Sequence, residues 1–264
     1  MEVLNELPAE VDHLLHFLSS QPVPGIGGGV ISNYIFFMGI GIIILSVLMW
    51  VGVRNLKLVP EHKLSNAVEA LGQFVRDDIA ASMIEHGSRK HFPFLATIFF
   101  FVLINNIVGL FPGSKPGTGT MGVTVALSTT VFIYFNTVGF KNQGFFGYIK
   151  SFAPHGVPFP INLIVWFIEV FSAFLRIFTL AVRLFANMYA GHIILGIFAI
   201  LTSLFAQGMI EEFSARTVIG ALPSIGWLTL MTALYLLEIL VAFVQAYVFT
   251  LLTAVYIGQA AEAH

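Results

Sequence analysis

The sequence has no cysteine and few charged residues, and both absences exclude whole classes of protein. Without cysteine the chain cannot form disulfides, iron–sulfur clusters or thiolate metal sites. Charged residues make up 10% of its 264 residues, against about 25% in ordinary globular proteins. So few charges cannot cover a water-soluble surface, which argues against a soluble enzyme. The formal net charge of −2 gives no electrostatic attraction for nucleic acid.

Lysine and arginine are also absent from 1–29. A secretory signal peptide needs a basic start and a mitochondrial presequence needs arginines, so neither is expected here. Apolar residues, by contrast, make up 57% of the chain, with 27 phenylalanines, which excludes disorder. We therefore expect an all-α, multi-pass membrane protein, in a bacterial plasma membrane or, if encoded by the organelle, in the mitochondrial inner membrane.

Three apolar runs have the ordinary length of a transmembrane helix, which is about 20 residues. The first is 30–53, and the other two, 92–111 and 121–140, give two spans within 92–140. We expect three ordinary spans from these runs.

Between the first two spans, 54–91 is expected to contain an amphipathic surface helix. Apolar residues recur there every three or four positions, with charged residues between them: Leu64, Val68, Leu71, Val75, Ile79 and Met83. This spacing places them on one helix face. That face can lie on the membrane surface or pack on a partner subunit, and the two alternatives are compatible.

The distribution of Lys and Arg predicts the orientation, because cytoplasmic loops are enriched in them. Segments 54–91 and 141–160 hold eight of the twelve: Arg54, Lys57, Lys63, Arg76, Arg89, Lys90, Lys141 and Lys150. The 112–120 loop holds only Lys115. We expect an outer N-terminal segment 1–29, inner segments at 54–91 and 141–160, and an inner tail at 259–264.

The last two apolar runs are much longer than a bilayer requires. Residues 161–206 contain no proline, and as one helix they would be about 69 Å long, whereas the bilayer core is about 30 Å thick. A polar segment, 207–217, separates them from a second long run, 218–258. We expect 161–258 to form a hairpin of two long, strongly tilted helices; the sequence leaves open whether the first is one bent helix or two.

Five titratable residues interrupt these long runs: Glu169, Arg176, Arg183, His192 and Glu238. A charge at the bilayer centre costs about 2.5–3.5 kcal/mol on insertion scales, so such residues indicate an ion path, a relay or a counter-ion. Glu169 and Arg176 can instead be a structural pair, although two helical turns between them predict no easy direct contact. Arg183 is the most isolated, so its counter-anion can come from another subunit.

Helical spacing also predicts which of these side chains share a face. Arg183 and His192 are nine positions apart and therefore face opposite ways, while Asn187 lies one turn from Arg183 on its face. Glu238 and Gln245 share a face of the last helix. His192 and Glu238 can meet across the hairpin, either as a proton relay or as a hydrogen bond that joins the two arms.

Three segments carry a recognisable pattern. They are Leu-Ala-Val-Arg-Leu-Phe-Ala-Asn-Met-Tyr-Ala-Gly-His at 180–192, the last helix at 236–257 with its Gln-Ala-Tyr-Val-Phe motif, and Asn-Asn-Ile-Val-Gly-Leu-Phe-Pro at 105–112. Together and in this order they closely resemble subunit a of the F-type ATP synthase. The resemblance covers most of the chain from about residue 30.

The resemblance implies a proton-translocating stator subunit that binds no nucleotide and no cofactor and is not an enzyme by itself. Its partners would be the c-ring, peripheral-stalk b subunits and the lipid bilayer. Protons would pass through two offset half-channels at the c-ring. Arg183 would draw the ring carboxylate into its ionised form and block direct leakage between them.

The other polar residues acquire roles from the same resemblance. Asn187 and Gln245 match polar positions beside the arginine, and His192 and Glu238 match the pair in the outer half-channel, in the order that mitochondrial members show. Glu169, Arg176 and Thr179 fall on matching polar positions toward the inner exit. Sodium coupling occurs in the family, but the imidazole of His192 favours protons.

Two other functions fit the sequence less well. A secondary ion-coupled transporter would also carry intramembrane charges, but it usually shows internal repeats with interrupted helices, and the two halves of this chain show none. An intramembrane hydrolase is contradicted by the absence of HExxH, G-x-S-x-G and paired intramembrane aspartates.

Overall fold

The computed structural model describes residues 7–19, 32–54, 63–85, 87–111, 113–151, 161–211 and 215–261. Five helices in these ranges are long and apolar enough to cross a membrane. They are α3 (Asn33–Arg54), α6 (Ser88–Gly109), α7 (Met121–Ser151), α8 (Ile161–Glu211) and α9 (Ala215–Ala261). The predicted fold class, an all-α polytopic protein with three ordinary spans and two long helices, is confirmed. The connection at 152–160 and the last three residues lie outside the described ranges.

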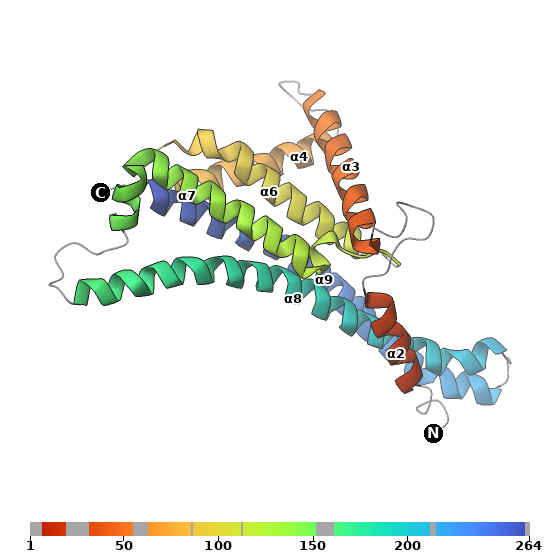
Figure 1. Ribbon diagram of the computed structural model, residues 1–264. Coiled ribbons are helices and arrows are strands. Elements are labelled where there is room, and N and C mark those ends of the chain that lie inside the picture. Colours follow the sequence, from red (N-terminus) through yellow and green to blue (C-terminus); the bar gives the residue numbers. More distant parts are fainter. Residues whose placement is uncertain are drawn as a thin grey trace.

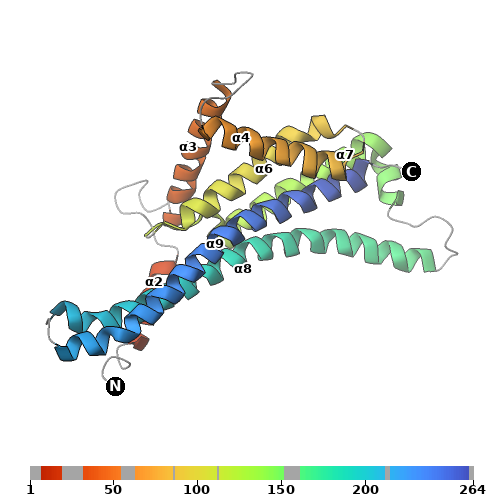
Figure 2. The ribbon, with the colours of Figure 1, turned by 180° about the vertical axis from the view of Figure 1, so that it is seen from behind.

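The two long helices, α8 and α9, pack side by side and are the longest helices of the described structure (Figures 1 and 2). α8 is a single helix of 51 residues, and Figure 1 shows it curving rather than breaking. Without an internal proline it keeps its hydrogen-bond ladder and bends gently, as long helices do. Both helices extend into the polar segment at 207–217, most of which is therefore helical.

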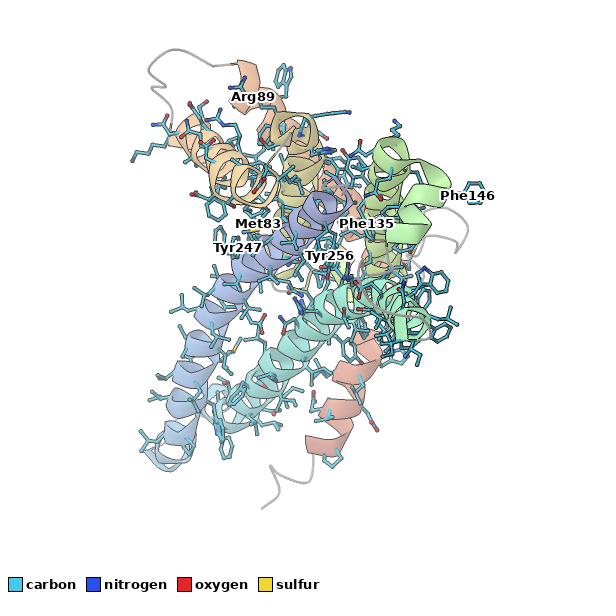
Figure 3. The ribbon with its side chains drawn as sticks, turned by 90° about the vertical axis from the view of Figure 1, so that its left-hand side faces the viewer. Met83, Arg89, Phe135, Phe146, Tyr247 and Tyr256 are labelled. Atoms are coloured by element: carbon cyan, nitrogen blue, oxygen red, sulfur yellow. The ribbon has the colours of Figure 1, made fainter. Side chains whose placement is uncertain are left out.

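The core lies between α6, α7 and the C-terminal half of α9, and one face of α8 contributes Leu180 and Leu184 to it. Its largest fully buried side chains include Leu95 and Phe99 of α6, Leu184 of α8 and Ile257 of α9. Phe135 of α7 and Tyr256 of α9 face each other near its centre, with ring centroids 5.8 Å apart (Figure 3). This burial fixes which face of α8 is turned inward and leaves the opposite face exposed.

The described part of the segment between α3 and α6, residues 63–85, is mostly helical, as expected, but it is not one regular helix. It contains α4 (Lys63–Gln73), a π-helix η2 (Phe74–Ala80) and the short α5 (Ala81–Met83). Val75 and Ile79 of the predicted apolar stripe are fully buried, and η2 packs on α6 and α9. This half of the stripe is therefore covered by the chain's own helices, an arrangement that neither sequence-based alternative included.

Close backbone contact at Gly258 fixes α9 against this segment. A Cβ atom built on Gly258 would collide with the main-chain oxygen of Met83, and a backbone atom cannot turn aside as a side chain can. Gly258→Val is expected to destabilise the protein by about 1–3 kcal/mol, as overpacking usually does, and to lower its thermal midpoint in detergent. Gly72→Ala is the matched control, because nothing lies within 4 Å of that Cβ; an equal loss in both variants would contradict the contact.

Two shorter features complete the fold. α2 (Leu7–Leu18) packs on α8, where Leu14 occupies the space that a side chain at Gly196 would need. α7 reverses direction at Gly144, whose φ of 71° is left-handed and therefore favours glycine. Beyond this turn Phe146 is 84% exposed and projects away from the bundle (Figure 3).

Candidate functional site

Arg183 lies on the exposed face of α8. Its neighbours Leu180, Ala181 and Leu184 are buried, and they fix the opposite face of the helix against the rest of the chain. Thr179 and Asn187, one turn before and one turn after, are exposed together with Arg183. The prediction that Arg183 and Asn187 share a face agrees with this geometry.

No carboxylate in the described part of the chain forms an ion pair with Arg183. The ion pairs in that part are Arg76–Asp77 and Arg176–Glu169. The exposed surface of α8 on the side of Arg183 is otherwise largely apolar, with Ile168, Leu175 and Ile194 on it. A guanidinium offers five donors and accepts none, and a charge in an apolar layer is costly. This surface therefore has a cation without a counter-anion, and a partner that brings an anion would supply it.

Gln245 of α9 lies against the main chain of Arg183. Its side chain is only 4% exposed, and its Nε2 donates a hydrogen bond of 2.8 Å to the Arg183 carbonyl oxygen. Ala242 and Ala246 beside it are fully buried, which allows the two helices to approach closely. The Oε1 atom of Gln245 is buried without a hydrogen-bond partner in the described ranges. Gln245 thus fixes the position of α8 at Arg183 and keeps one acceptor free.

His192 faces the interior, as the nine-residue spacing from Arg183 predicts. Its Nε2 is buried and has no hydrogen-bond partner among the described residues. The ring lines a small pocket together with Tyr34 of α3, Lys115 and Tyr189. Arg183 and His192 therefore lie on the same helix but face different surroundings.

Glu238 of α9 lies against α8 at the level of Gly191. A Cβ atom added to Gly191 would collide with the Glu238 carboxylate, which places that carboxylate against the α8 backbone, one residue before the histidine. The structure thus brings the two arms together at this point. Within the described ranges, His192 Nε2 forms no hydrogen bond with Glu238. The structure therefore does not contain the alternative, a direct hydrogen bond from this atom that joins the two arms.

Glu169 and Arg176 form a direct ion pair, and the expectation that they are too far apart for easy contact is wrong. Arg176 Nη2 lies 3.2 Å from Glu169 Oε1, and Arg176 Nη1 donates to Gln259 Oε1 at 3.1 Å. The guanidinium also lies 5.2 Å from the Tyr256 ring centroid. The helical rise separates the two Cα atoms by about 10.5 Å, and the two long side chains bridge this distance by extending toward each other along the helix.

Thr179 has a local role in the structure. Its hydroxyl donates to the carbonyl oxygens of Leu175 and Arg176, at 3.0 and 3.1 Å. This is the usual back-bonding of threonine within a helix. The hydroxyl nevertheless remains exposed between Arg176 and Arg183.

In the sequence Lys115 bears only on the predicted membrane orientation, but in the structure it is a buried residue that lines the His192 pocket. It is 2% exposed, its Nζ donates to the Ser19 carbonyl oxygen at 3.1 Å, and it lies 5.2 Å from the Tyr34 ring centroid. Burial lowers the pKa of this lysine. Its isolation as the only cation of the 112–120 loop was the available signal.

The polar groups occupy three levels along α8. By helical rise, Arg183 lies about 10 Å from Arg176 and about 13 Å from His192. One level holds Glu169, Arg176 and Gln259; one holds Arg183 with Gln245; and one holds His192 with Glu238. Such an arrangement can exchange protons at two separate depths with a fixed cation between them. Within the described ranges no group of three His, Asp or Glu could hold a metal ion.

Comparisons with known proteins agree on one family. The family model described as "ATP synthase A chain" matches residues 35–258. "ATP synthase subunit a" of Rhodopseudomonas palustris (strain BisB18) is 39% identical over 240 residues, covering 90% of this chain and 92% of that protein. "ATP synthase subunit a 2" of Chlorobium luteolum is 35% identical over 249 residues, covering 93% and 69%. "ATP synthase subunit a" of Rubrobacter xylanophilus is 36% identical over 242 residues, covering 89% and 86%.

These matches span nearly the whole chain, including the segments that carry Arg183, His192 and Glu238. They provide no support for the alternative of a secondary ion-coupled transporter. The chain therefore belongs to the family of ATP synthase subunit a.

Proposed function

We propose that Arg183 separates two offset aqueous half-channels at the interface between this chain and a ring of c subunits. Protons reach the ring carboxylate through one half-channel and leave through the other after the ring has turned. As a member of its family, the chain is a proton-translocating membrane subunit of ATP synthase and not the catalytic one. The half-channels, the c-ring contact and the role of Arg183 are the parts that we propose.

The observation that carries this proposal is the environment of Arg183. The side chain is exposed on an apolar helix face, and no described carboxylate pairs with it. A ring helix with an ionisable carboxylate supplies both things that this face lacks, an apolar cover and an anion. Arginine stays protonated at any accessible pH, so it can attract the carboxylate without relaying the proton itself.

The remaining polar residues divide between the two half-channels. We assign His192 and Glu238 to the outer one, with Asn187 and Gln245 beside Arg183. We assign Glu169, Arg176 and Thr179 to the inner one. Five spans would leave the two ends of the membrane domain on opposite sides, and the positive-inside rule favours an outer N-terminus and an inner C-terminus. The peripheral-stalk b subunits would cover part of the remaining surface.

The energetics favour a fixed cation at this place. A membrane potential of 100 mV is worth about 2.3 kcal/mol for each proton that crosses, and this free energy is lost whenever a proton crosses without moving the ring. A permanent positive charge between two water-filled pockets raises the barrier to a hydronium ion and attracts a carboxylate. Arg183 satisfies both requirements.

Cross-linking tests which face of the chain contacts the ring. The chain has no native cysteine, so Asn187→Cys provides a single attachment point for a photoactivatable cross-linker in the intact complex. It is expected to give a product containing this chain and one c subunit, detected by mass spectrometry. Ile133→Cys is the matched control, because Ile133 is also exposed, by 60%, but lies on α7. Products with c subunits from Ile133→Cys and none from Asn187→Cys would contradict the proposed face.

A further inference from the structure

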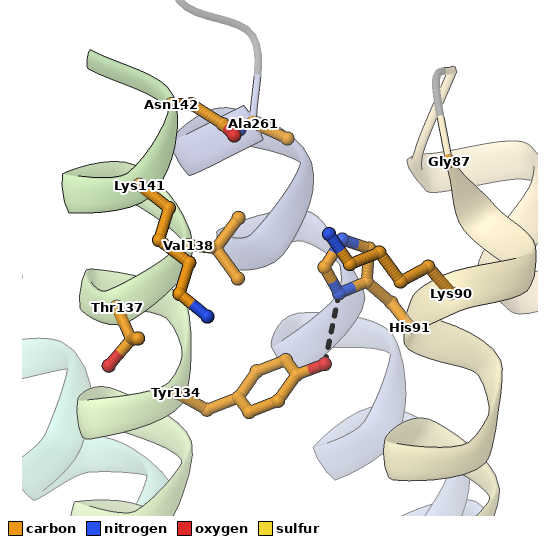
Figure 4. A pocket seen from close by; sticks show the side chains of 9 residues that line it. All are labelled: Gly87, Lys90, His91, Tyr134, Thr137, Val138, Lys141, Asn142 and Ala261. Atoms are coloured by element: carbon orange, nitrogen blue, oxygen red, sulfur yellow. Dashed lines mark hydrogen bonds between the residues drawn. The ribbon is translucent and has the colours of Figure 1, made fainter. Parts of the chain in front are cut away.

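A second polar site lies at the opposite end of α6 and α7 from the Lys115 loop. It is a pocket of about 420 Å³ bounded by the start of α6, the end of the α7 span and the last residue of α9. Figure 4 shows its nine lining residues: Gly87, Lys90, His91, Tyr134, Thr137, Val138, Lys141, Asn142 and Ala261. None of the residues assigned to the proton path is among them.

The polar groups of this pocket are mostly hydrogen-bond donors. Lys90 and Lys141 extend into it from two different helices (Figure 4). His91 Nδ1 and the Tyr134 hydroxyl are 3.0 Å apart and hold each other in the wall. No Asp or Glu lines the pocket, and neither lysine forms an ion pair with a carboxylate of the described ranges. Two ammonium groups that share a pocket without an acid favour an anionic ligand.

The start of α6 adds to this preference. Gly87, in the left-handed region with φ of 83°, is its N-cap, and no side chain caps the helix. The first turn of a helix has free N–H groups and a partial positive charge, both of which stabilise anions. Because Gly87 lines the pocket, this helix end acts together with the lysines.

We propose that this pocket binds the headgroup phosphate of an anionic phospholipid. Two observations favour a lipid over a free anion. The pocket lies at the end of transmembrane helices, where headgroups are found, and basic pockets between helix ends typically take such groups. In addition, Ile133 and Phe140 are exposed on α7, one turn from Thr137 on the same face, and offer an apolar surface to an acyl chain next to the headgroup.

The lipid would join the ends of three helices that otherwise meet around a polar gap. A phosphate between Lys90 and Lys141 would neutralise two like charges contributed by α6 and α7. The α9 terminus at Ala261 borders the same pocket. The bound headgroup therefore stabilises the end of the bundle that lies farthest from the hairpin turn, without taking part in proton transfer.

The test uses the intact ATP synthase in nanodiscs that contain a photoactivatable phosphatidylglycerol analogue, with labelled peptides mapped by mass spectrometry. Labelling is expected around Thr137 and Phe140, and much less with a phosphatidylcholine analogue. Competition with unlabelled phosphatidylglycerol gives the affinity. Each lysine near an anionic headgroup contributes about fivefold, so Lys90→Gln with Lys141→Gln is expected to weaken binding about 25-fold. Lys90→Arg with Lys141→Arg keeps both charges and should label like the wild type.

The matched control is Lys63→Gln with Arg89→Gln, which removes two exposed cations that do not line the pocket. An equal loss of lipid binding in the control and in the pocket variant would show that the effect comes from general surface charge, and it would overturn the proposal. Equal labelling by phosphatidylcholine, or full displacement by inorganic phosphate, would also overturn it, since the site would then not be one for an anionic lipid.

A carboxylate of the chain itself is the remaining competitor. Glu262 follows Ala261 and lies outside the described residues. Glu262→Gln is expected to label like the wild type. A several-fold gain in labelling would show that this carboxylate occupies the pocket in the native protein and would overturn the proposal.

Discussion

Arg183→Ala is expected to abolish ATP-driven proton pumping into membrane vesicles while the ATP synthase stays assembled. Assembly should survive because the side chain is exposed and forms no ion pair within the described ranges. The neighbouring contacts of Leu180 and Leu184, which hold α8 in place, are unchanged. Pumping should stop because no cation remains to draw the ring carboxylate into its ionised form.

The same substitution is expected to increase passive proton leakage. Two unit charges about 5 Å apart repel by about 3 kcal/mol at an effective dielectric constant near 20. If the guanidinium presents this barrier to a hydronium ion, its removal raises the leak on the order of a hundredfold. The leak is measured as the decay of an imposed proton gradient in vesicles from which the catalytic sector has been removed.

Two further variants separate charge from geometry. Arg183→Lys keeps the positive charge but loses the planar fork of donors, so the leak should stay low while pumping falls. Arg89→Ala removes an exposed cation at the start of α6 and should change neither quantity. Full pumping by Arg183→Ala would contradict the assigned role, and an unchanged leak would show that the barrier lies elsewhere.

The sequence was sufficient for the fold class because its information is local. Runs of about 20 apolar residues predict spans whatever their neighbours are, and five such helices are present. The length of 161–206 predicted a segment that must bend, break or tilt, and left one bent helix or two as alternatives; α8 is one curved helix. Helical periodicity also predicted that Arg183 and His192 face different ways.

Other features could not be predicted because they depend on tertiary packing. Periodicity shows that Val75 and Ile79 share a face, but not that α6 and α9 of the same chain would cover it. Nothing local brings Lys115 to the wall of the His192 pocket, more than 70 positions away along the chain. The pocket between Lys90 and Lys141 likewise exists only because the start of α6 and the 141–142 part of α7 lie at the same level.

Glu238→Ala is expected to slow ATP synthesis driven by an imposed proton gradient by about tenfold or more, since a positioned proton-exchanging group typically contributes at least that much. The reason lies in where the carboxylate sits. It is placed against the α8 backbone at Gly191, one residue before His192, whose Nε2 has no hydrogen-bond partner among the described residues. Removing it takes one proton-exchanging carboxylate from this level of the described structure, while His192 remains. Glu238→Asp, with a shorter side chain, should give an intermediate rate.

Gly191→Ala tests the position of this carboxylate rather than its presence. The added methyl group would occupy the place of the Glu238 carboxylate, which is the free end of a flexible side chain and can move aside at little cost in stability. The complex should therefore assemble normally but synthesise ATP several-fold more slowly. Wild-type rates for Glu238→Ala over a range of pH would remove Glu238 from the path. Slow synthesis by Glu238→Ala together with wild-type synthesis by Gly191→Ala would mean that the carboxylate acts from a different position, because a relay depends on the few ångströms that separate one proton carrier from the next.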